Sequence, residues 1–221
     1  MQRLFPREGE TRPRLRFPEF CSNPNWQEAT LGDVVDFESG GTPSKQNGDF
    51  WNGEIPWVTA KDMKQLFLEE TEDHITQTAI RDGAKVAPAR TVLMLTRGMT
   101  LFKEVPICIL RRPMSFNQDV KALRTKGDVT ATFLPFLLLA NKQRLRDLVD
   151  PAGHGTGRLN TDDVKALRIR YPRADEQNRL SACFTSLELL IAAQVERLEA
   201  LRTHKRGLMQ ELFPRLSGAE A

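Results

Sequence analysis

The chain has few cysteines, no long apolar run and little net charge. Its three cysteines, Cys21, Cys108 and Cys183, lie at wide spacing, which fits neither a disulfide framework nor a zinc site. No apolar stretch approaches the roughly 18 residues of a membrane span. The Arg-rich N-terminus also lacks the apolar segment of a signal peptide, so we expect a cytoplasmic protein with no membrane contact. A net charge of +3 permits nucleic-acid binding without requiring it.

The motifs of several enzyme classes are also missing. A DNA methyltransferase needs an Asn-Pro-Pro-Tyr-like motif and a glycine-rich cofactor loop after a strand, and neither occurs. Asp163-Val164-Lys165 is a weak match to the acid–lysine pattern of nucleases, and the start of a helix explains these acids more simply. Gly153–Gly157 lacks the Gly-Lys-Ser/Thr ending of a phosphate loop, so it is either a flexible connection or part of a contact surface. His74, His154 and His204 show no metal-ligand spacing. We expect no catalytic residue, no metal and no cofactor.

A long heptad pattern occupies the C-terminal part of the chain. From Leu180 onward, positions suited to helix packing recur at alternating steps of four and three residues, which is the period of a coiled-coil seam. Tyr171-Pro172 blocks an upstream continuation, Asp175 can cap the first turn, and Pro214 ends the helix. The apolar seam positions are Leu180, Phe184, Leu187, Ile191, Leu198, Leu201, Leu208 and Leu212.

This predicted helix is long for the domain that precedes it. At about 1.5 Å per residue it spans roughly 57 Å, more than a compact domain of this size needs. We therefore predict a partner helix, and a homodimer through the seam supplies one. The polar seam residues Gln194 and Lys205 would cost stability and restrict the register of pairing. The alternative is that the helix lies across the sheet of its own domain.

Between Trp26 and Tyr171 the sequence alternates strand-like and helix-like patterns. Together with the heptad segment they predict an α+β fold, a globular mixed α/β domain followed by one long coiled-coil helix. The expected elements are a turn into a short strand or helical turn at Leu31–Glu38, strands at Glu54–Thr59, Thr91–Thr96, Val105–Leu110 and Leu167–Tyr171, a helix at Phe133–Val149 and a short element at Thr161–Leu167.

The two ends of the chain share a hexapeptide. Met1–Pro6 and Met209–Pro214 differ only at the third residue. The second copy lies at the exit of the heptad helix, which indicates that the chain spans one period of a longer tandem arrangement. On this interpretation the Arg- and Pro-rich residues up to Phe20 form an extended, solvated lead-in.

Several short motifs, weak one by one, together resemble a known family. They are Trp26, Leu31-Gly32-Asp33, Gly40–Ser44, Trp51–Val58, Phe116–Asp119, the glycine loop Gly153–Gly157, and Pro172 followed by Glu176-Gln177. Their order and spacing are similar to one target-recognition domain and its following helix in the specificity subunits of type I restriction-modification systems. A complete subunit of that family carries two such domains and two such helices, so this chain resembles a half-subunit.

The resemblance implies a DNA-binding specificity subunit that is not itself an enzyme, with its recognition domain reading one half of a bipartite site. Its expected partners are double-stranded DNA, the methyltransferase subunit and, with it, the restriction subunit. The alternative is a structural or regulatory half-subunit that dimerises or docks the methyltransferase without reading a defined site. The expected organisation is a lead-in at 1–20, a recognition domain at 21–174, a helix at 175–214 and a tail at 215–221.

The residues that would contact DNA are expected on loops. Base edges are read by projecting polar side chains, whereas phosphates are bound by Lys, Arg and backbone amides. The loop that begins at Ser39-Gly40-Gly41 offers three residues that are equally good candidates, namely Ser44, Lys45 and Asn47. The chosen candidates are Lys61 after the strand at Trp57, Arg97 in the Thr96–Gly98 turn, and Thr156, Arg158 and Asn160 beside the glycine loop.

Two polar pairs are expected to serve the fold instead. Asn117-Gln118 lies in mid-domain beside Phe116 and Val120, so we predict that it is buried and fixes loops through hydrogen bonds. Glu176-Gln177 is expected to act at the start of the helix, where an acidic residue favours the positive end of the dipole.

Overall fold

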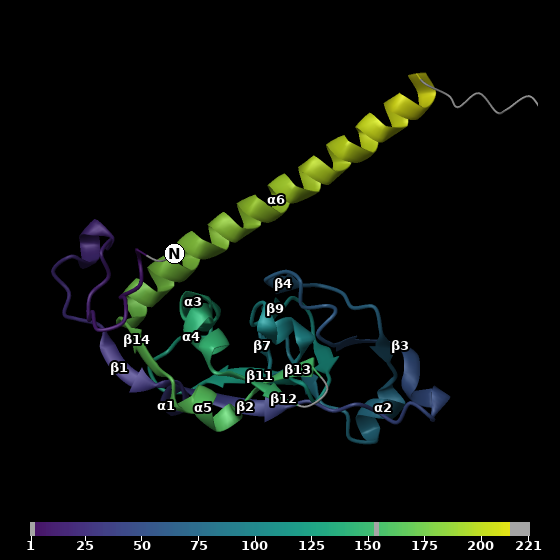
Figure 1. The fold of residues 1–221 in the computed structure, drawn as a ribbon, viewed down its shortest axis with the longest axis horizontal. Coiled ribbons are helices and arrows are strands. Elements are labelled where there is room, and N and C mark those ends of the chain that lie inside the picture. Colours follow the sequence, from purple (N-terminus) through teal and green to yellow (C-terminus); the bar gives the residue numbers. More distant parts are fainter. Residues whose placement is uncertain (1–2, 153–154, 213–221) are drawn as a thin grey trace, which may run out of the picture. The chain divides into compact units, whose positions relative to one another are not determined.

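The computed structural model describes residues 3–152 and 155–212, in two compact units, Met1–Ser181 and Ala182–Ala221. The first is a mixed α/β domain that ends with the first two turns of helix α6 (Ala174–Leu212), and the second contains the rest of that helix (Figure 1). The predicted α+β class with one long helix is confirmed. None of the helices in the described part of the chain combines the length and the apolarity needed to cross a bilayer.

A five-stranded sheet forms the centre of the first unit. Its strand order is β2-β11-β7-β9-β4, and its pairs are antiparallel except β4–β9. All residues of β7 are buried, which agrees with the continuous apolar run at that point in the sequence. The predicted strands at Thr91–Thr96 and Val105–Leu110 are confirmed as β7 and β9. The bounds are β2 Val35–Ser39, β4 Phe67–Leu68, β7 Val92–Leu95, β9 Ile107–Leu110 and β11 Val120–Thr125.

A four-stranded sheet, ordered β5-β3-β10-β6, has a small core of its own. Phe50, Trp57, Ile75 and Ala79 are buried together beside it. The strand predicted at Glu54–Thr59 begins earlier, at Trp51, because an irregularity between Trp51 and Ile55 lets the longer strand pair with β5. The elements are η2 Gly48–Phe50, β3 Trp51–Val58, β5 His74–Ile75, α2 Gln77–Arg81, β6 Val86–Ala87 and β10 Met114–Phe116.

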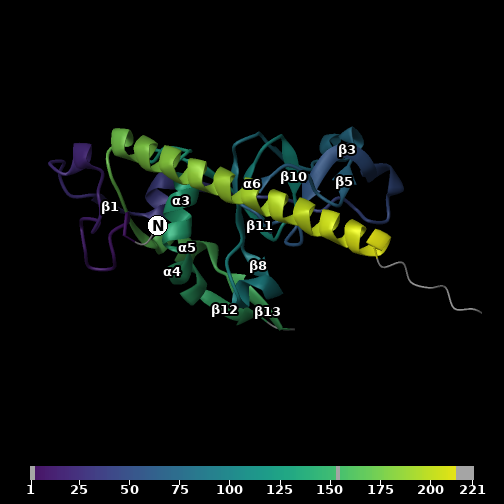
Figure 2. The same cartoon turned by 90° about the horizontal axis from the view of Figure 1, so that it is seen from above.

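Two smaller sheets complete the first unit. A three-stranded sheet joins β12 (Val149–Ala152), β13 (Thr156–Leu159) and β8 (Arg97–Gly98), and η3 (Met99–Phe102) follows β8 directly (Figure 2). The predicted strand before Pro172 is confirmed as β14 (Arg168–Tyr171), which pairs with β1 (Gln27–Thr30). The turn at Leu31–Glu38 is resolved as α1 (Leu31–Val34) leading into β2, and the element after Asn160 is α5 (Thr161–Ala166).

The single helix predicted at Phe133–Val149 is two helices. They are α3 (Leu134–Ala140) and α4 (Lys142–Asp147), which meet at Asn141. The Asn141 side-chain amide donates to the Leu137 carbonyl at 2.8 Å, a local bond that competes with continuation of the helix. The leucines at helical spacing that favoured one helix form its core side, since Leu134, Leu137, Leu138 and Leu145 are buried and only Leu148 is half-buried.

The N-terminal segment differs from the solvated lead-in predicted from its composition. Phe5 is buried, stacks on Phe133 at 5.7 Å and meets Trp26 edge-on at 5.5 Å. A 3-10 helix, η1 (Pro18–Phe20), follows. A composition rich in Arg and Pro favoured solvent exposure, but the aromatic contacts of one residue anchor the segment to the domain.

Candidate nucleic-acid interface

Two predicted DNA-contact residues, Arg97 and Arg158, are brought together by the three-stranded sheet. Arg158 on β13 lies directly opposite Arg97 on β8. Both are exposed, and in the described part of the chain neither guanidinium has an ion-pair partner. Two like charges opposite each other on neighbouring strands are unfavourable without a counterion. The pair is therefore suited to an anion such as a DNA phosphate.

Two glycines fix the backbone that carries these arginines. Gly98 adopts a φ of +152°, a conformation that other residues rarely adopt. A Cβ on Gly157 would lie 2.8 Å from Val149 Cγ1 and 3.0 Å from Leu101 Cβ, so β13 needs glycine to approach its neighbours closely. The predicted glycine loop is thus partly a strand, because Thr156 and Gly157 belong to β13, while Gly153 and His154 lie outside the described residues.

Beyond Arg158, the sheet continues to Asp150 on β12, which is exposed and lies opposite Arg158. Thr156, a predicted contact, is half-buried and lies opposite Ala152 in the same hairpin. Asn160 already serves the fold, because its side-chain oxygen accepts from the Asp162 backbone at 3.1 Å and caps α5. Of the predicted contact residues in this part of the fold, Arg97 and Arg158 are the two exposed cations that form no ion pair within the described residues.

Lys61 is separate from this sheet. Its ammonium forms ion pairs with Glu72 at 2.8 Å and Asp73 at 3.0 Å. Hydrogen bonds to these two carboxylates raise the pKa of Lys61, with Glu72 the larger cause. A lysine already paired with two acids is less suited to a phosphate than an unpaired arginine, and its role in DNA binding stays a prediction.

The first loop, Gly40–Ser44, is held by the domain around it. A Cβ on Gly40 would lie 2.1 Å from the Phe116 carbonyl, which excludes any side chain. Trp57 Nε1 donates to the Gly41 carbonyl at 3.0 Å, and Trp51 Nε1 donates to that of Ser44 at 3.0 Å. Asn47 caps η2 through Asp49. Lys45 is exposed and remains a rival contact.

The Asn117-Gln118 pair fixes loops as predicted, although only one member is buried. Asn117 is buried, and its side-chain oxygen accepts from the Asp119 backbone at 3.1 Å. Gln118 is exposed and accepts a hydrogen bond from the Thr42 hydroxyl, so it ties the first loop to the end of β10. Burial was thus wrongly predicted for Gln118, because its loop position faces solvent.

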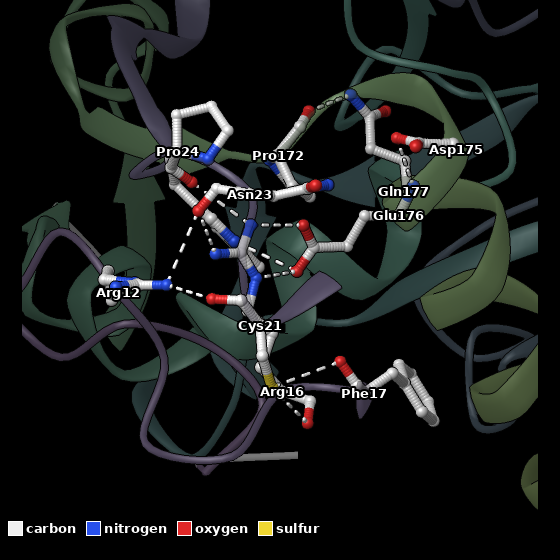
Figure 3. A network of polar contacts seen from close by, with 11 residues as sticks. Arg12, Arg16, Phe17, Cys21, Asn23, Pro24, Pro172, Asp175, Glu176 and Gln177 are labelled. Atoms are coloured by element: carbon white, nitrogen blue, oxygen red, sulfur yellow. Dashed lines mark hydrogen bonds and ion pairs between the residues drawn. The ribbon is translucent and has the colours of Figure 1, made fainter. Parts of the chain in front are cut away.

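The start of α6 is fixed by buried polar contacts that the sequence did not predict (Figure 3). Glu176 forms a bidentate pair with Arg16, with distances of 2.8 Å and 2.6 Å, and Trp26 Nε1 donates to the same carboxylate at 3.3 Å. The side chains of Arg16 and Glu176 are only 6% and 2% exposed. Glu176 therefore ties the N-terminal segment to the helix, which is more than the helix-start role predicted for it.

Gln177, the next residue of α6, forms hydrogen bonds to the segment before α3 and to the residue before Arg173. Its amide donates to the carbonyls of Asp128 and Pro172, each at 2.8 Å, and its oxygen accepts from the Thr130 backbone at 2.8 Å. The helix begins at Ala174, two residues earlier than a cap at Asp175 requires, so Asp175 lies inside the first turn. Its carboxylate accepts from the Glu176 backbone.

The predicted seam of α6 divides into two parts. Leu180 and Phe184 are buried, at 2% and 5% exposure. The other apolar seam residues are between 43% and 71% exposed. Leu190, Val195 and Met209 add to this exposed apolar surface, which is far larger than scattered single residues would give. The exposed seam residues are Leu187, Ile191, Leu198, Leu201, Leu208 and Leu212.

The described side chains offer no obvious reaction centre. No group of three or more His, Cys, Asp or Glu residues among them is arranged to hold a metal ion. His74 pairs with Glu70 at 2.8 Å, and Asp162 and Asp163 lie in the first turn of α5. Burial raises the pKa of the Cys108 thiol to about 12, which disfavours the reactive thiolate.

Comparison with known proteins identifies the family. Residues 23–202 match the model of the type I restriction modification DNA specificity domain. The chain belongs to this family.

Its relatives in the family are larger proteins. The chain is 27% identical over 171 residues to the EcoR124I/EcoR124II specificity subunit of Escherichia coli, a match that covers 76% of this chain and 42% of that one. It is 25% identical over 194 residues to the MjaIX specificity subunit of Methanocaldococcus jannaschii, covering 86% and 44%. The chain thus spans less than half the length of these relatives.

A solved structure shares the fold. The HsdS subunit from Thermoanaerobacter tengcongensis superposes with a TM-score of 0.58 at 19% identity, over 88% of this chain and 42% of that one. The family resemblance predicted from the sequence is confirmed.

Proposed function

We propose that this chain is a non-catalytic specificity subunit of a type I restriction-modification system, which binds double-stranded DNA and reads one half of a bipartite site. The observation that carries the proposal is the exposed Arg97–Arg158 pair, which forms no ion pair within the described chain although Asp150 lies opposite Arg158 on β12, within a family defined by DNA specificity. The methyltransferase subunit, and with it the restriction subunit, would supply the chemistry. DNA is its target, so we place the protein in the cytoplasm.

The exposed seam of α6 supports a homodimer. Full burial of one apolar side chain contributes roughly 1.5 to 3 kcal/mol. Six exposed seam residues could each contribute up to this amount to the free energy of dimerisation, from which the entropic cost of association is subtracted. The recognition domain precedes the helix in the chain, so antiparallel pairing would place two copies of it at opposite ends of the helix pair. The two copies would then read the same short sequence on opposite strands, as a split palindrome with an unread spacer.

Helix length limits the spacing of such a site. The 39 residues of α6 extend over roughly 58 Å at about 1.5 Å per residue. One DNA turn is about 34–36 Å. The half-site centres are therefore expected between about one and one and a half turns apart. Parallel pairing would place both domains at one end and remove this spacing.

Selection from a random duplex library, with and without the methyltransferase subunit, tests the function. A divided palindrome among the selected sequences is the expected result, and an undivided asymmetric site would refute the antiparallel arrangement. Dimerisation and methyltransferase binding without any selected sequence would instead favour a structural or regulatory half-subunit. Methyl transfer by the chain alone would refute the non-catalytic assignment.

Variants of the arginine pair connect that function to the proposed interface. Arg97→Ala/Arg158→Ala should weaken DNA binding and reduce the slope of log affinity against log salt by about 0.9 for each phosphate that the variant no longer binds. Arg81→Ala is the matched control, because Arg81 is an exposed arginine at the end of α2 with no ion-pair partner in the described chain. Equal salt slopes for the two variants would show that the sheet does not contact phosphates.

A further inference from the structure

The short helix η3 presents two large apolar side chains to solvent beside the arginine pair. Met99 is 70% exposed and Phe102 is 49% exposed, whereas Leu101 between them is fully buried. Exposing Met and Phe side chains is unfavourable in water. An exposed apolar pair at the edge of a charged surface therefore requires an explanation in terms of what covers it.

The backbone of η3 is held in place. Leu101 packs against β13, where its Cβ would lie 3.0 Å from a Cβ on Gly157. Gly98, at φ +152°, provides the turn from β8 into η3. The Lys103 amide then closes the helix by donating to the Thr100 carbonyl at 2.9 Å. Met99 and Phe102 thus project from a fixed support, which a contact of defined geometry requires.

Several cations adjoin this apolar pair in the chain or in the sheet, and the nearby acids are Asp150, opposite Arg158, and Glu104, which pairs with Lys142. Arg97 immediately precedes Gly98 and the helix, Lys103 immediately follows the helix, and Arg158 lies opposite Arg97. None of these three side chains forms an ion pair within the described residues. On α4, Arg146 donates to the Lys103 carbonyl at 3.5 Å, which adds a further guanidinium beside η3. Exposed apolar groups beside cations that form no ion pair match DNA, in which base edges lie between two lines of phosphates.

We propose that Met99 and Phe102 contact base edges of the DNA target, while Arg97 and Arg158 bind the flanking phosphates. This inference rests on the proposed function and adds specificity-determining residues to it. In the major groove the apolar feature of a base edge is the 5-methyl group of thymine, which apolar side chains contact. The recognised half-site is therefore expected to include a thymine whose methyl group these residues cover.

The test begins with a duplex selected from a random library by the wild-type protein with its methyltransferase subunit. Affinity is then measured for that duplex and for a scrambled duplex of the same composition. Met99→Ala/Phe102→Ala should lose roughly tenfold or more in affinity for the selected duplex and little for the scrambled one. Leu15→Ala/Val86→Ala is the control, because both side chains are exposed apolar residues elsewhere on the first unit.

A second measurement leaves the protein unchanged. Replacing thymines of the selected duplex by uracil, one at a time, removes a single methyl group each. At one position or more, the wild type should lose several-fold in affinity, and the Met99→Ala/Phe102→Ala variant should show no further loss there. Agreement of both experiments supports the inference.

The results of these experiments distinguish failure of the base-contact inference from failure of the proposed DNA-binding function. If the wild type selects a sequence but the variant keeps its full preference and no uracil substitution has an effect, the inference is overturned and the DNA-binding function stands. Loss of methyltransferase capture with unchanged DNA preference also overturns it, since η3 would then bind protein. If the wild type selects no sequence, the proposed function fails and the inference fails with it.

Discussion

The buried pair of Arg16 and Glu176 offers a strong test of how the first unit is held together. Glu176→Gln keeps the size of the side chain but leaves the Arg16 guanidinium, only 6% exposed, without its counter-charge. Removing one partner of a buried ion pair costs about 3 to 5 kcal/mol. For a unit of this size, each kcal/mol lowers the melting temperature by about 2 to 4 °C, so the expected decrease is roughly 10 °C.

Thermal unfolding followed by tryptophan fluorescence measures this change. All three tryptophans, Trp26, Trp51 and Trp57, lie in the first unit, so the signal reports on that unit. Glu199→Gln is the matched control, because Glu199 pairs with Arg202 at 2.7 Å with both side chains more than 60% exposed. An exposed pair of this kind contributes about 0 to 1 kcal/mol.

A double variant distinguishes the charge effect from the removal of other hydrogen bonds. Arg16→Met/Glu176→Met removes both charges and should recover part of the stability lost in Glu176→Gln. Recovery stays partial because Arg16 also donates to the carbonyls of Asn23 and Pro24, at 3.0 Å and 3.2 Å. If Glu176→Gln and Glu199→Gln lower the melting temperature equally, the buried pair does not anchor the helix start and the reasoning is refuted.

Three further predictions concern packing, the thiols and the seam. Gly157→Ala should destabilise the first unit by about 1 to 3 kcal/mol in urea unfolding, because the Cβ of the new alanine would meet Val149 and Leu101. The control Gly207→Ala lies in open space within α6, so it should be neutral or stabilising. Iodoacetamide at pH 8 should modify Cys21, which is exposed, and leave Cys108 unmodified until unfolding, because Cys108 is buried and its pKa is raised to about 12; rapid modification of Cys108 in the folded protein, detected by mass spectrometry, would contradict this. Because the folded pKa of Cys108 lies above its ordinary value of 9.0, its contribution to stability should be lost as the pH rises from about 9 towards 12. Leu187→Asp/Leu198→Asp should convert the dimer to a monomer in light scattering, whereas a monomeric wild type would disprove dimerisation through the seam.

Much of the architecture followed from local patterns. The heptads predicted α6, and the apolar runs predicted β7, β9 and β14. These elements can be recognised because the spacing of apolar residues along the chain reflects which positions of a helix or strand are buried. Phe133–Val149 was predicted as one helix because its leucines keep a helical period across Asn141, and the side-chain bond that interrupts it is a competing local interaction.

The candidate interface was only partly predictable for a different reason. Arg97 and Arg158 were both proposed from their turn and loop positions, but only the pairing of β8 with β13 shows that they face each other. Lys61 was an equal candidate in the sequence, and its ion pairs with Glu72 and Asp73 depend on the fold. The partners of Arg16 and Glu176 were likewise hidden, because the two residues are distant in the chain and meet only after folding.

The facing arginines have one consequence for the free protein. Their repulsion opposes the pairing of β8 with β13, at a cost of about 0.2 to 1 kcal/mol for like charges on opposed strands. Added salt screens that repulsion, so moderate ionic strength should favour the pairing of β8 with β13 in the unbound chain. It also screens the attraction between Arg158 and Asp150 on β12, and it weakens the binding of the arginines to a polyanion. Ionic strength would therefore act in opposite directions on the pairing of β8 with β13 and on the binding of DNA by the arginines that these strands carry.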